Sequence, residues 1–462
     1  MESIVRCPTG IEWFDEITGG GLVRGTLTLL AGNPRTGKTS FVAKFLFKGA
    51  KDYGEPGIYV SFAETKGKFY VYMAQQGLNF KEIENGGLFK FLGASTVLDR
   101  DVLGHFLAEI LEVVEKLEAK RLVIDSITPI LQLASSLEVR SILHNALSNL
   151  ANVKNLTIIL VADLPFGESK VGYGVEEFIV NSVILLRLQY EPYRSLRRTM
   201  EIVKMRGTPI LNAVYEYSIV PKVGFIVFVP LKTSEACVRP DVKISTGVKG
   251  LDEMLGGGLS KGSSTLIIGS SGSGKTVLAL TIAAEAAFKG LNIVYINFEE
   301  LKSHLEHSLR GLGYSYEELE SRSLKVVPHL PHVMPSGALR YHLHQVHVMR
   351  GFDKDLAIID GLAALKRFYD EAAFQQILEE VISFLKYHGI TAIYCMAKVD
   401  PLAKTAWLIN SSDNVILTDM KVEGNRVHRK LMVLKSRMTQ ADDRVYELCF
   451  VDGRLTVKVE EG

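Results

Sequence analysis

Two glycine-rich stretches of this 462-residue chain have the composition and spacing of phosphate-binding loops. Both fit the pattern G-x-x-x-x-G-K-[ST], and each follows an apolar run and precedes a stretch with helical character. Glycine lets the backbone pass close to phosphate oxygens, so that backbone N–H groups and the start of the next helix face the anion. The residues predicted to bind the phosphates are Gly32, Asn33, Pro34, Arg35, Thr36, Gly37, Lys38, Thr39 and Ser40, and Gly269, Ser270, Ser271, Gly272, Ser273, Gly274, Lys275, Thr276 and Val277.

The lysine and threonine at the end of each loop have distinct predicted roles. Lys38 and Lys275 are predicted to reach the β- and γ-phosphates of ATP, and the hydroxyls of the following threonines to bind Mg²⁺. The first loop is the less typical of the two, because Pro34 lacks an N–H and Arg35 is bulky. We still expect it to bind nucleotide.

Two aspartates complete the predicted magnesium sites. Asp125 and Asp360 end the apolar runs 121–124 and 356–359, which follow the two loops in the chain. An apolar strand that ends in aspartate is common, but in this position an acidic residue holds Mg²⁺ through water beside the loop. The predicted metal-binding pairs are therefore Thr39 with Asp125 and Thr276 with Asp360.

A further group of carboxylates differs between the two halves of the chain. Glu64 follows the apolar run 58–60, whereas Glu299 and Glu300 follow the similar run 293–296. A glutamate beyond the carboxyl end of a strand can activate the water that attacks the γ-phosphate, which contributes about 10²–10⁴ in rate. The alternative is a solvated glutamate at a helix N-terminus. Because the first half has Ala63 in place of Glu299, we predict that the second half is the faster hydrolase.

The elements that position these residues occur twice. The paired residues Lys38 and Lys275 lie 237 positions apart, as do the glycine runs 19–21 and 256–258 that precede the loops. The spacing drifts slightly further on, to 235 for the two aspartates, as small loop insertions in a tandem domain would produce. The repeat predicts a first domain over 1–232, a linker at 233–241 and a second domain over 242–462.

Each half alternates apolar runs with helical stretches. In the first half we expect strands at 27–31, 58–62, 122–125, 157–161 and 183–188. Continuous apolar strands of this kind are typical of a parallel sheet covered on both faces. The shorter runs at the end of each half leave no room for crossover helices and indicate antiparallel strands. The predicted fold class is α/β, twice.

Composition limits the class of protein. A hydrophobic content of 47%, a charged content of 23% and a net charge of +1 are ordinary for a globular protein, and they give no bulk attraction to nucleic acid or anionic membrane. No apolar run is long enough to span a bilayer, and the first ten residues lack the layout of a signal peptide. The four cysteines form no Cys-x-x-Cys pair, and a reducing cytoplasm is the expected location.

The motifs together resemble the KaiC family of ATPases. The resemblance is carried by the tandem loops with their preceding Gly-Gly-Gly-Leu runs, the Phe-Glu-Glu phrase at 298–300 and the stretch 202–208, IVKMRGT. It implies two tandem RecA-like P-loop domains, each a mostly parallel twisted sheet flanked by helices with antiparallel strands at the end. It also implies a hexameric double ring with ATP between subunits.

The resemblance assigns a role to two basic pairs. In this family a Lys-x-Arg strand reaches the γ-phosphate held by the neighbouring subunit, which here implies Lys204 and Arg206, and Lys435 and Arg437. Residues two apart on a strand share a face, and a cation supplied in trans contributes about 10³–10⁵ to phosphoryl transfer. The alternative is a solvated edge strand.

The chain departs from the family pattern near its end. Family members that phosphorylate themselves use a Ser-Thr pair before a strand of the second domain, and counting back from Asp413 the corresponding residues here are Ile409 and Asn410. Ser411 and Ser412 are nearby but out of register. The sequence also lacks the long tail through which the clock protein receives its activator. We therefore expect an ATPase that acts outside the circadian clock.

Two rival functions stay open. A Ser/Thr autokinase would be detected by the intact mass after incubation with ATP. A DNA-associated motor of the RecA type would show DNA-stimulated ATP hydrolysis with a steep salt dependence, although the neutral net charge counts against it. A downstream protein partner is expected, and the sequence does not identify it.

Two further clusters of residues, one of histidines and one of basic residues, give weaker indications of function. Seven of the eleven histidines lie between residues 304 and 347, where a metal site is conceivable but an exposed or subunit-interface cluster is favoured. The basic stretch 193–198, YRSLRR, fits a solvated hairpin tip better than a nucleic-acid contact.

Overall fold

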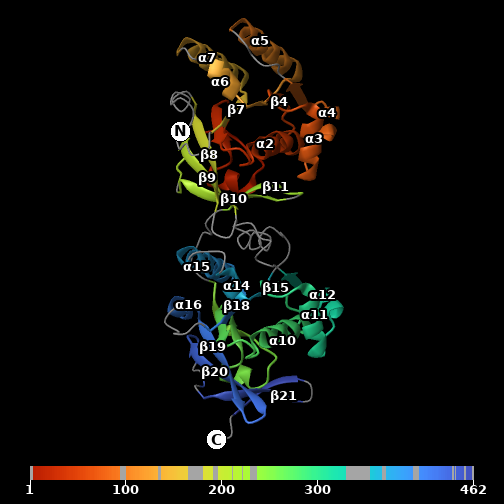
Figure 1. Cartoon of the computed structure of the whole chain (residues 1–462), viewed down its shortest axis with the longest axis vertical. Helices are drawn as coiled ribbons and strands as arrows, with labels where there is room; N and C mark the ends of the chain where they lie inside the picture. Colours follow the sequence, from red (N-terminus) through yellow and green to blue (C-terminus); the bar gives the residue numbers. More distant parts are fainter. Residues whose placement is uncertain are drawn as a thin grey trace. The chain divides into compact units, whose positions relative to one another are not determined.

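The computed structural model describes residues 4–93, 100–133, 137–164, 180–190, 196–210, 212–220, 222–228, 237–328, 354–366, 371–398, 405–439, 442, 444–451 and 454–459. These residues form two compact units, the first ending at residue 228 and the second beginning at residue 237 (Figure 1). Of the predicted linker, residues 233–236 lie outside the described residues and 239–241 belong to a strand of the second unit. The boundaries drawn from the sequence stay predictions.

The first unit alternates strands and helices as the sequence predicts. Its elements are β1 Arg6–Cys7, α1 Glu12–Ile17, β2 Leu22–Val23, β3 Leu27–Gly32, α2 Lys38–Tyr53, β4 Gly57–Ser61, α3 Lys66–Gln75, α4 Phe80–Asn85, β5 Phe89–Gly93, α5 Arg100–Leu117, β6 Arg121–Asp125, α6 Thr128–Leu133, α7 Leu137–Lys154, β7 Thr157–Asp163, β8 Ser182–Tyr190, β9 Leu196–Met205, β10 Val214–Val220 and β11 Gly224–Phe228.

The second unit repeats this arrangement. Its elements are β12 Arg239–Ile244, α9 Leu251–Met254, β13 Leu259–Lys261, β14 Ser264–Gly269, α10 Lys275–Phe288, β15 Ile293–Asn297, α11 Lys302–Gly311, α12 Tyr316–Ser321, β16 Leu324–Pro328, β17 Leu356–Asp360, α14 Leu362–Leu365, α15 Glu371–Tyr387, β18 Thr391–Ala397, α16 Ala406–Ser411, β19 Asn414–Glu423, β20 Arg426–Ser436, β21 Tyr446–Val451 and β22 Arg454–Val459.

Each unit contains one large mixed sheet of nine described strands, and the two sheets have the same strand order. The described strands β1 and β2, and β12 and β13, pair separately as two-stranded sheets. The first sheet runs β5-β4-β6-β7-β3-β8-β9-β10-β11, and the second runs β16-β15-β17-β18-β14-β19-β20-β21-β22. The strands from β5 to β8 and from β16 to β19 pair in parallel. The last strands of each sheet pair antiparallel. The predicted fold class is therefore confirmed.

Helices cover both faces of each parallel region (Figure 1). In the first unit α2, α3 and α4 pack on one face, and α5 and α7 pack on the other. Successive residues of β4 alternate between the two cores, since Tyr59 lies in one and Ile58 and Val60 lie in the other. The second unit buries α10, α11 and α12 on one face, and α14, α15 and α16 on the other. This double burial explains why the strands read as continuous apolar runs.

The parallel register brings the chemically important strand ends to one edge. Gly32, which ends β3, is paired with Asp163 at the end of β7, and Ser61 of β4 is paired with Asp125 of β6. In the second unit Asn297 of β15 is paired in the same way with Asp360 of β17. The carboxyl ends of these strands therefore form one edge in each unit, where open α/β sheets bind their ligands.

No helix among the residues that the structure describes is long and apolar enough to cross a membrane.

Candidate nucleotide-binding sites

The two glycine-rich stretches adopt the same backbone path. Each connects the central strand of its sheet to a helix, β3 to α2 and β14 to α10. The hydroxyl of Thr36 donates to the carbonyl of Asn33 at 2.8 Å, and the hydroxyl of Ser273 donates to the carbonyl of Ser270 at 2.8 Å. The glycine before each lysine is left-handed, with φ of 88° and 98°. The first loop thus keeps its shape despite its unusual residues.

Arg35 meets a conformational cost to maintain that shape. Its φ is +68°, in the left-handed region, and the equivalent residue of the second loop is Gly272 with φ of +77°. A residue with a Cβ disfavours this region by about 1–2 kcal/mol, whereas glycine does not. The same turn is therefore built at a higher energy in the first half than in the second.

The loop lysines fold back onto their own loops. Lys38 Nζ donates to the carbonyls of Gly32 and Asn33 at 2.7 and 3.2 Å. Lys275 Nζ donates to the equivalent carbonyls at 3.0 and 2.8 Å. Burial lowers the pKa of Lys275 from its ordinary value. Both ammonium groups thus lie at the concave side of the loop, where the phosphates of a nucleotide would be bound.

The predicted threonine–aspartate pairs are in contact. The Thr39 hydroxyl donates to Asp125 Oδ2 at 3.0 Å, and the Thr276 hydroxyl donates to Asp360. A tyrosine from the neighbouring strand holds each carboxylate: Tyr59 Oη donates to Asp125 at 2.6 Å, and Tyr295 Oη donates to Asp360 at 2.8 Å. Burial raises the pKa of both carboxyls, and these hydrogen bonds oppose that rise. Each half therefore presents a fixed hydroxyl and carboxylate beside its loop lysine.

The predicted glutamates lie in the turn that leaves the neighbouring strand. In the first half the Glu64 N–H donates to Ser61 Oγ at 2.9 Å. In the second half Asn297 Oδ1 accepts from the N–H groups of Glu299 and Glu300, at 2.8 and 2.6 Å. Each turn is also bonded to the neighbouring strand. The Phe62 N–H donates to the Asp125 carbonyl, and the Phe298 N–H donates to the Asp360 carbonyl, both at 3.1 Å. The glutamates are thus held at the same edge as the loops.

The electrostatic setting of the glutamates suits proton transfer. Burial, and then the neighbouring Asp360, raise the pKa of Glu300, and burial and Asp125 do the same for Glu64. The Glu299 side chain lies so close to Gly361 that a Cβ there would be 2.7 Å from its Cγ. Burial lowers the pKa of Lys275, and the carboxylates of Asp360 and Glu299 oppose that lowering. Ala63 leaves the first half without a counterpart of Glu299.

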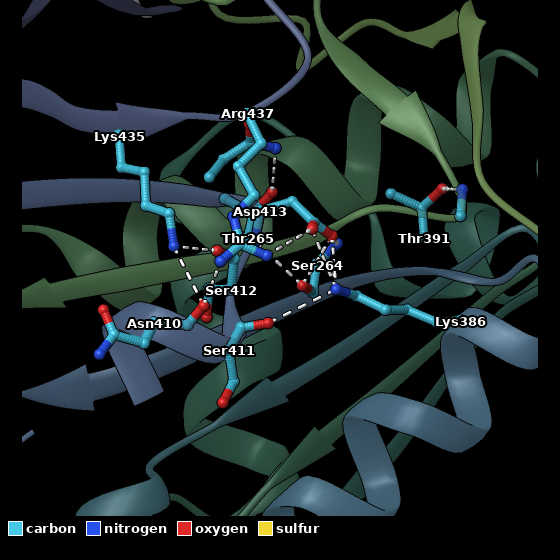
Figure 2. A network of polar contacts seen from close by, with 12 residues as sticks. Ser264, Thr265, Lys386, Thr391, Asn410, Ser411, Ser412, Asp413, Lys435 and Arg437 are labelled. Atoms are coloured by element: carbon cyan, nitrogen blue, oxygen red, sulfur yellow. Dashed lines mark hydrogen bonds and ion pairs between the residues drawn. The ribbon is translucent and has the colours of Figure 1, made fainter. Parts of the chain in front are cut away.

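The Lys-x-Arg pairs lie away from the loops of their own unit. Lys435 Nζ donates to the carbonyls of Ile409, Asn410 and Ser412 at 2.7, 3.1 and 2.7 Å (Figure 2). Arg437 donates to the Asn410 carbonyl at 2.8 Å. Figure 2 shows both cations directed toward the end of α16, where carbonyl groups attract positive charge. The first half keeps the same contact, since Lys204 Nζ donates to the Val180 carbonyl at 2.8 Å.

The pairing of strands places these cations at the opposite edge of the sheet. Lys435 is paired with Val415 of β19, and Val415 is paired with Leu266, three residues before the loop begins at Gly269. At about 3.3 Å per residue, this is roughly 10 Å along the strand, and the Lys435 side chain points away from the loop. Lys435 and Arg437 therefore do not reach a nucleotide held by their own unit.

Asp413 holds this edge together. Its carboxylate, 6% exposed, forms an ion pair with Lys386 at 2.8 Å and accepts from the N–H and hydroxyl of Ser264, both at 2.9 Å (Figure 2). Arg437 lies 3.9 Å from the same carboxylate. Burial lowers the pKa of Lys435, and Arg437 lowers it further. Asp413 thus holds the cations Lys386 and Arg437 against this edge of the sheet, which we call the cationic edge. In the first half Asn181 occupies the equivalent position.

The two serines near α16 are tied into the helix. The Ser411 hydroxyl donates to the Trp407 carbonyl and the Ser412 hydroxyl to the Leu408 carbonyl, both at 2.8 Å. Ser412 is fully buried. Neither hydroxyl is directed toward a phosphate loop.

Several weaker expectations fall partly outside the described residues. His304 and His307 lie on α11, whereas His329, His332, His342, His344 and His347 lie outside the described part of the chain. Within that part, no group of three His, Cys, Asp or Glu side chains could hold a metal ion. Of the basic stretch 193–198, residues 196–198 begin β9, and 193–195 lie outside the described residues.

Sequence reasoning missed three residues at the loop edge. Tyr59 and Tyr295 occupy equivalent positions of the repeat, so aligning the two halves would have found them. Asp163, which forms an ion pair with Lys38, has no such signal, because Ala397 occupies its position in the second half.

The fold and these sites define a class of protein: two tandem RecA-like P-loop domains. The family model of the KaiC ATPase matches residues 7–232 and again residues 244–461. The chain belongs to the KaiC family of ATPases.

Curated relatives agree with this assignment. The chain is similar to the "Circadian clock oscillator protein KaiC" of Prochlorococcus marinus, with 31% identity over 98% of this chain and 93% of the relative. It is likewise similar to the proteins of the same name from Synechococcus elongatus, with 31% identity over 98% and 88%, and from Thermostichus vulcanus, with 34% identity over 85% and 76%.

Proposed function

We propose that this chain binds and hydrolyses ATP at both loops, and that it does so as a hexameric double ring with nucleotide between subunits. The observation that carries the proposal is the division of each unit into two edges. The loop, the threonine–aspartate pair and the glutamates lie at one edge, and Lys435 and Arg437 lie at the other. A complete site then needs the loop edge of one copy and the cationic edge of the next, which is the heterologous contact that closes a ring.

The side chains present fit a bound Mg²⁺. Thr39 with Asp125, and Thr276 with Asp360, bring a hydroxyl and a carboxylate into contact beside each loop, and oxygen groups are the ligands that Mg²⁺ prefers. These residues would hold the ion, the aspartates through water. When bound, the ion neutralises charge on the phosphate oxygens.

The remaining groups of the chain have distinct tasks. The loop N–H groups and Lys275 bind and orient the triphosphate. Glu299 and Glu300 orient the attacking water. Glu300 accepts its proton, because burial raises the pKa of this carboxyl and so favours its protonated form. Lys435 and Arg437 of the adjacent copy stabilise the charge that develops on the transferred phosphoryl group. The first half uses Glu64 alone for the water and turns over more slowly.

We propose a regulatory or signalling ATPase of the cytoplasm that acts on a protein partner, outside the circadian clock. Nucleic acid is not the favoured partner, because the net charge is only +1.

The proposal predicts assembly that depends on nucleotide. With Mg-ATP, monomers or small oligomers should convert to hexamers in light scattering, since nucleotide bridges neighbouring copies. Replacing both loop lysines, Lys38→Ala with Lys275→Ala, should abolish the shift. Asp52→Asn, which removes an exposed carboxylate that pairs with Lys48 on α2, is the matched control and should assemble normally. A wild-type mass that ignores nucleotide would count against sites between subunits.

The hydrogen bonds at α16 predict that neither nearby serine is a phosphorylation site. After incubation with Mg-ATP, intact-mass measurement and peptide mapping should find no stoichiometric phosphate on Ser411 or Ser412, because both hydroxyls donate into the helix and Ser412 is buried. A parallel incubation with Mg-ADP gives the background. Phosphate at high occupancy on either serine would favour the autokinase instead.

A further inference from the structure

Among the residues that the structure describes, an ion pair at the first phosphate loop has no counterpart at the second. Lys38 Nζ lies 3.1 Å from Asp163 Oδ1, in addition to its two bonds to loop carbonyls. Asp163 ends β7 and is paired with Gly32, the residue that begins the loop. The carboxylate is therefore attached to the strand beside the loop and lies against the one ammonium group that the phosphates of a nucleotide need.

Asp163 is held in this position from two sides. Its other carboxylate oxygen, Oδ2, accepts from the Ser126 hydroxyl at 3.1 Å, and its backbone N–H donates to the Thr128 hydroxyl at 2.9 Å. The Lys38 side chain is 9% exposed and the Asp163 side chain 52% exposed. The pair thus joins a buried cation to an anion that faces the solvent side of the loop, where an incoming nucleotide arrives.

The second half has the loop lysine but lacks the carboxylate and both side chains that hold it. Ala397 is paired with Gly269 where Asp163 is paired with Gly32. By the alignment of the two halves, Gly361 replaces Ser126 and Ala363 replaces Thr128. Among the described residues Lys275 has no ion pair, and it contacts only the carbonyls of its own loop by hydrogen bonds. The two halves therefore allow a comparison between a loop beside Asp163 and a loop beside Ala397 at the equivalent position.

We propose that Asp163 is a specificity-determining residue of the first site, where its carboxylate pairs with Lys38 and selects against the triphosphate relative to the diphosphate. The inference rests on nucleotide binding at the first loop, proposed above. Binding of ATP must separate Lys38 from Asp163 and place the γ-phosphate near the carboxylate. ADP brings less negative charge to this side of the loop, so it meets less repulsion. Asp163 is a positioning residue, since it acts through its ion pair with Lys38 and through electrostatic repulsion of the γ-phosphate.

The size of the effect follows from the exposure of the pair. A partly exposed ion pair contributes only modestly to free energy, because water and salt screen it, and repulsion of the γ-phosphate acts in the same direction. Removing the charge should therefore strengthen ATP binding at the first site by roughly three- to tenfold, and ADP binding by less than about twofold.

The test compares the two halves within the full-length chain. In a Lys275→Ala background, which silences the second site, Asp163→Asn should raise the ATP/ADP affinity ratio of the first site by that factor. Affinities are measured by displacement of a fluorescent ADP, with a non-hydrolysable ATP analogue and with ADP. Asp163→Glu, which keeps the charge, should restore the wild-type ratio. In a Lys38→Ala background, Ala397→Asp should lower the ratio at the second site by a similar factor.

Two comparisons separate selectivity from simple structural support. Asp52→Asn removes an exposed carboxylate at the far end of α2 and should leave the ratio unchanged. If Asp163→Asn alters only thermal unfolding and not the ratio, the ion pair is merely structural and the inference is wrong. If Asp163→Asn does not fold, an unchanged ratio in Ala397→Asp overturns it equally. Absence of nucleotide binding at the first site both with and without Asp163 contradicts the proposed function there, and the inference with it.

Discussion

Replacing Lys435 by alanine should lower ATP hydrolysis by the second half by about 10³-fold or more, the contribution of a cation supplied in trans to phosphoryl transfer. Its ammonium lies at the edge of the sheet opposite its own loop and donates to three carbonyls near α16. The proposed role of Lys435 is therefore on the nucleotide of another copy. Steady-state hydrolysis is measured in a Lys38→Ala background, so that the second half alone is observed.

A mixing experiment distinguishes this role from support of α16. The mixture uses the single variants Lys435→Ala and Lys275→Ala, which both keep Lys38 and therefore a first loop that supports assembly. In an equal mixture, the intact second loop of one variant meets the intact cation of the other at about one interface in four, so roughly a quarter of the second-half activity should return above the rates of the separate variants. Arg426→Ala removes an exposed cation at the other end of β20 and should leave the rate unchanged. A mixture as inactive as its two components would mean that Lys435 supports only its own helix.

Glu299→Gln with Glu300→Gln should lower hydrolysis in the second half by roughly 10²-fold or more, because glutamine keeps the size of both side chains and removes the carboxylates that accept the proton. Glu299→Gln alone should also lower the rate, since it removes the carboxylate that Ala63 replaces in the first half and that lies against Gly361, next to Asp360. Glu64→Gln should change the total rate much less. Nucleotide affinity, measured separately, should stay close to that of the wild type.

The comparison that decides between the halves uses the loop lysines. Lys275→Ala should remove most of the steady-state rate, and Lys38→Ala should remove little of it. The reason is the missing carboxylate at Ala63, to which the strained backbone of Arg35 and the ion pair of Lys38 with Asp163 add. If the Lys275→Ala protein keeps most of its activity, the first half is the main hydrolase and our interpretation of the glutamates is wrong.

Much of the loop edge could be predicted from the sequence, because its features are local. The spacing of the glycines, Lys38 and Thr39 is read within eight residues, and Asp125 is found from the apolar run that it ends. The repeat then supplied an internal check, since each feature occurs a second time. The α/β class followed in the same way, from apolar runs whose length and continuity reflect burial on both faces.

Other parts of the site depend on which strands become neighbours. Asp163 is 125 residues from Lys38 in the sequence, and only the pairing of β7 with β3 brings them together. The opposite placement of Lys435 depends on β19 lying beside β14 and on the antiparallel return of β20. Strand order is set by long-range packing of many side chains, which no short window of sequence contains.

The sequence by itself determined that the chain carries two phosphate loops with their aspartates and glutamates, in two α/β halves of unequal carboxylate content. Only the tertiary structure decided that the loops and the basic strands lie at opposite edges, and that, within the described part of the chain, Lys38 forms an ion pair with a carboxylate whereas Lys275 does not. The physical reason is one of range. A loop forms from contacts between residues a few positions apart, whereas a site is completed by sheet register, which joins residues that the chain keeps far apart.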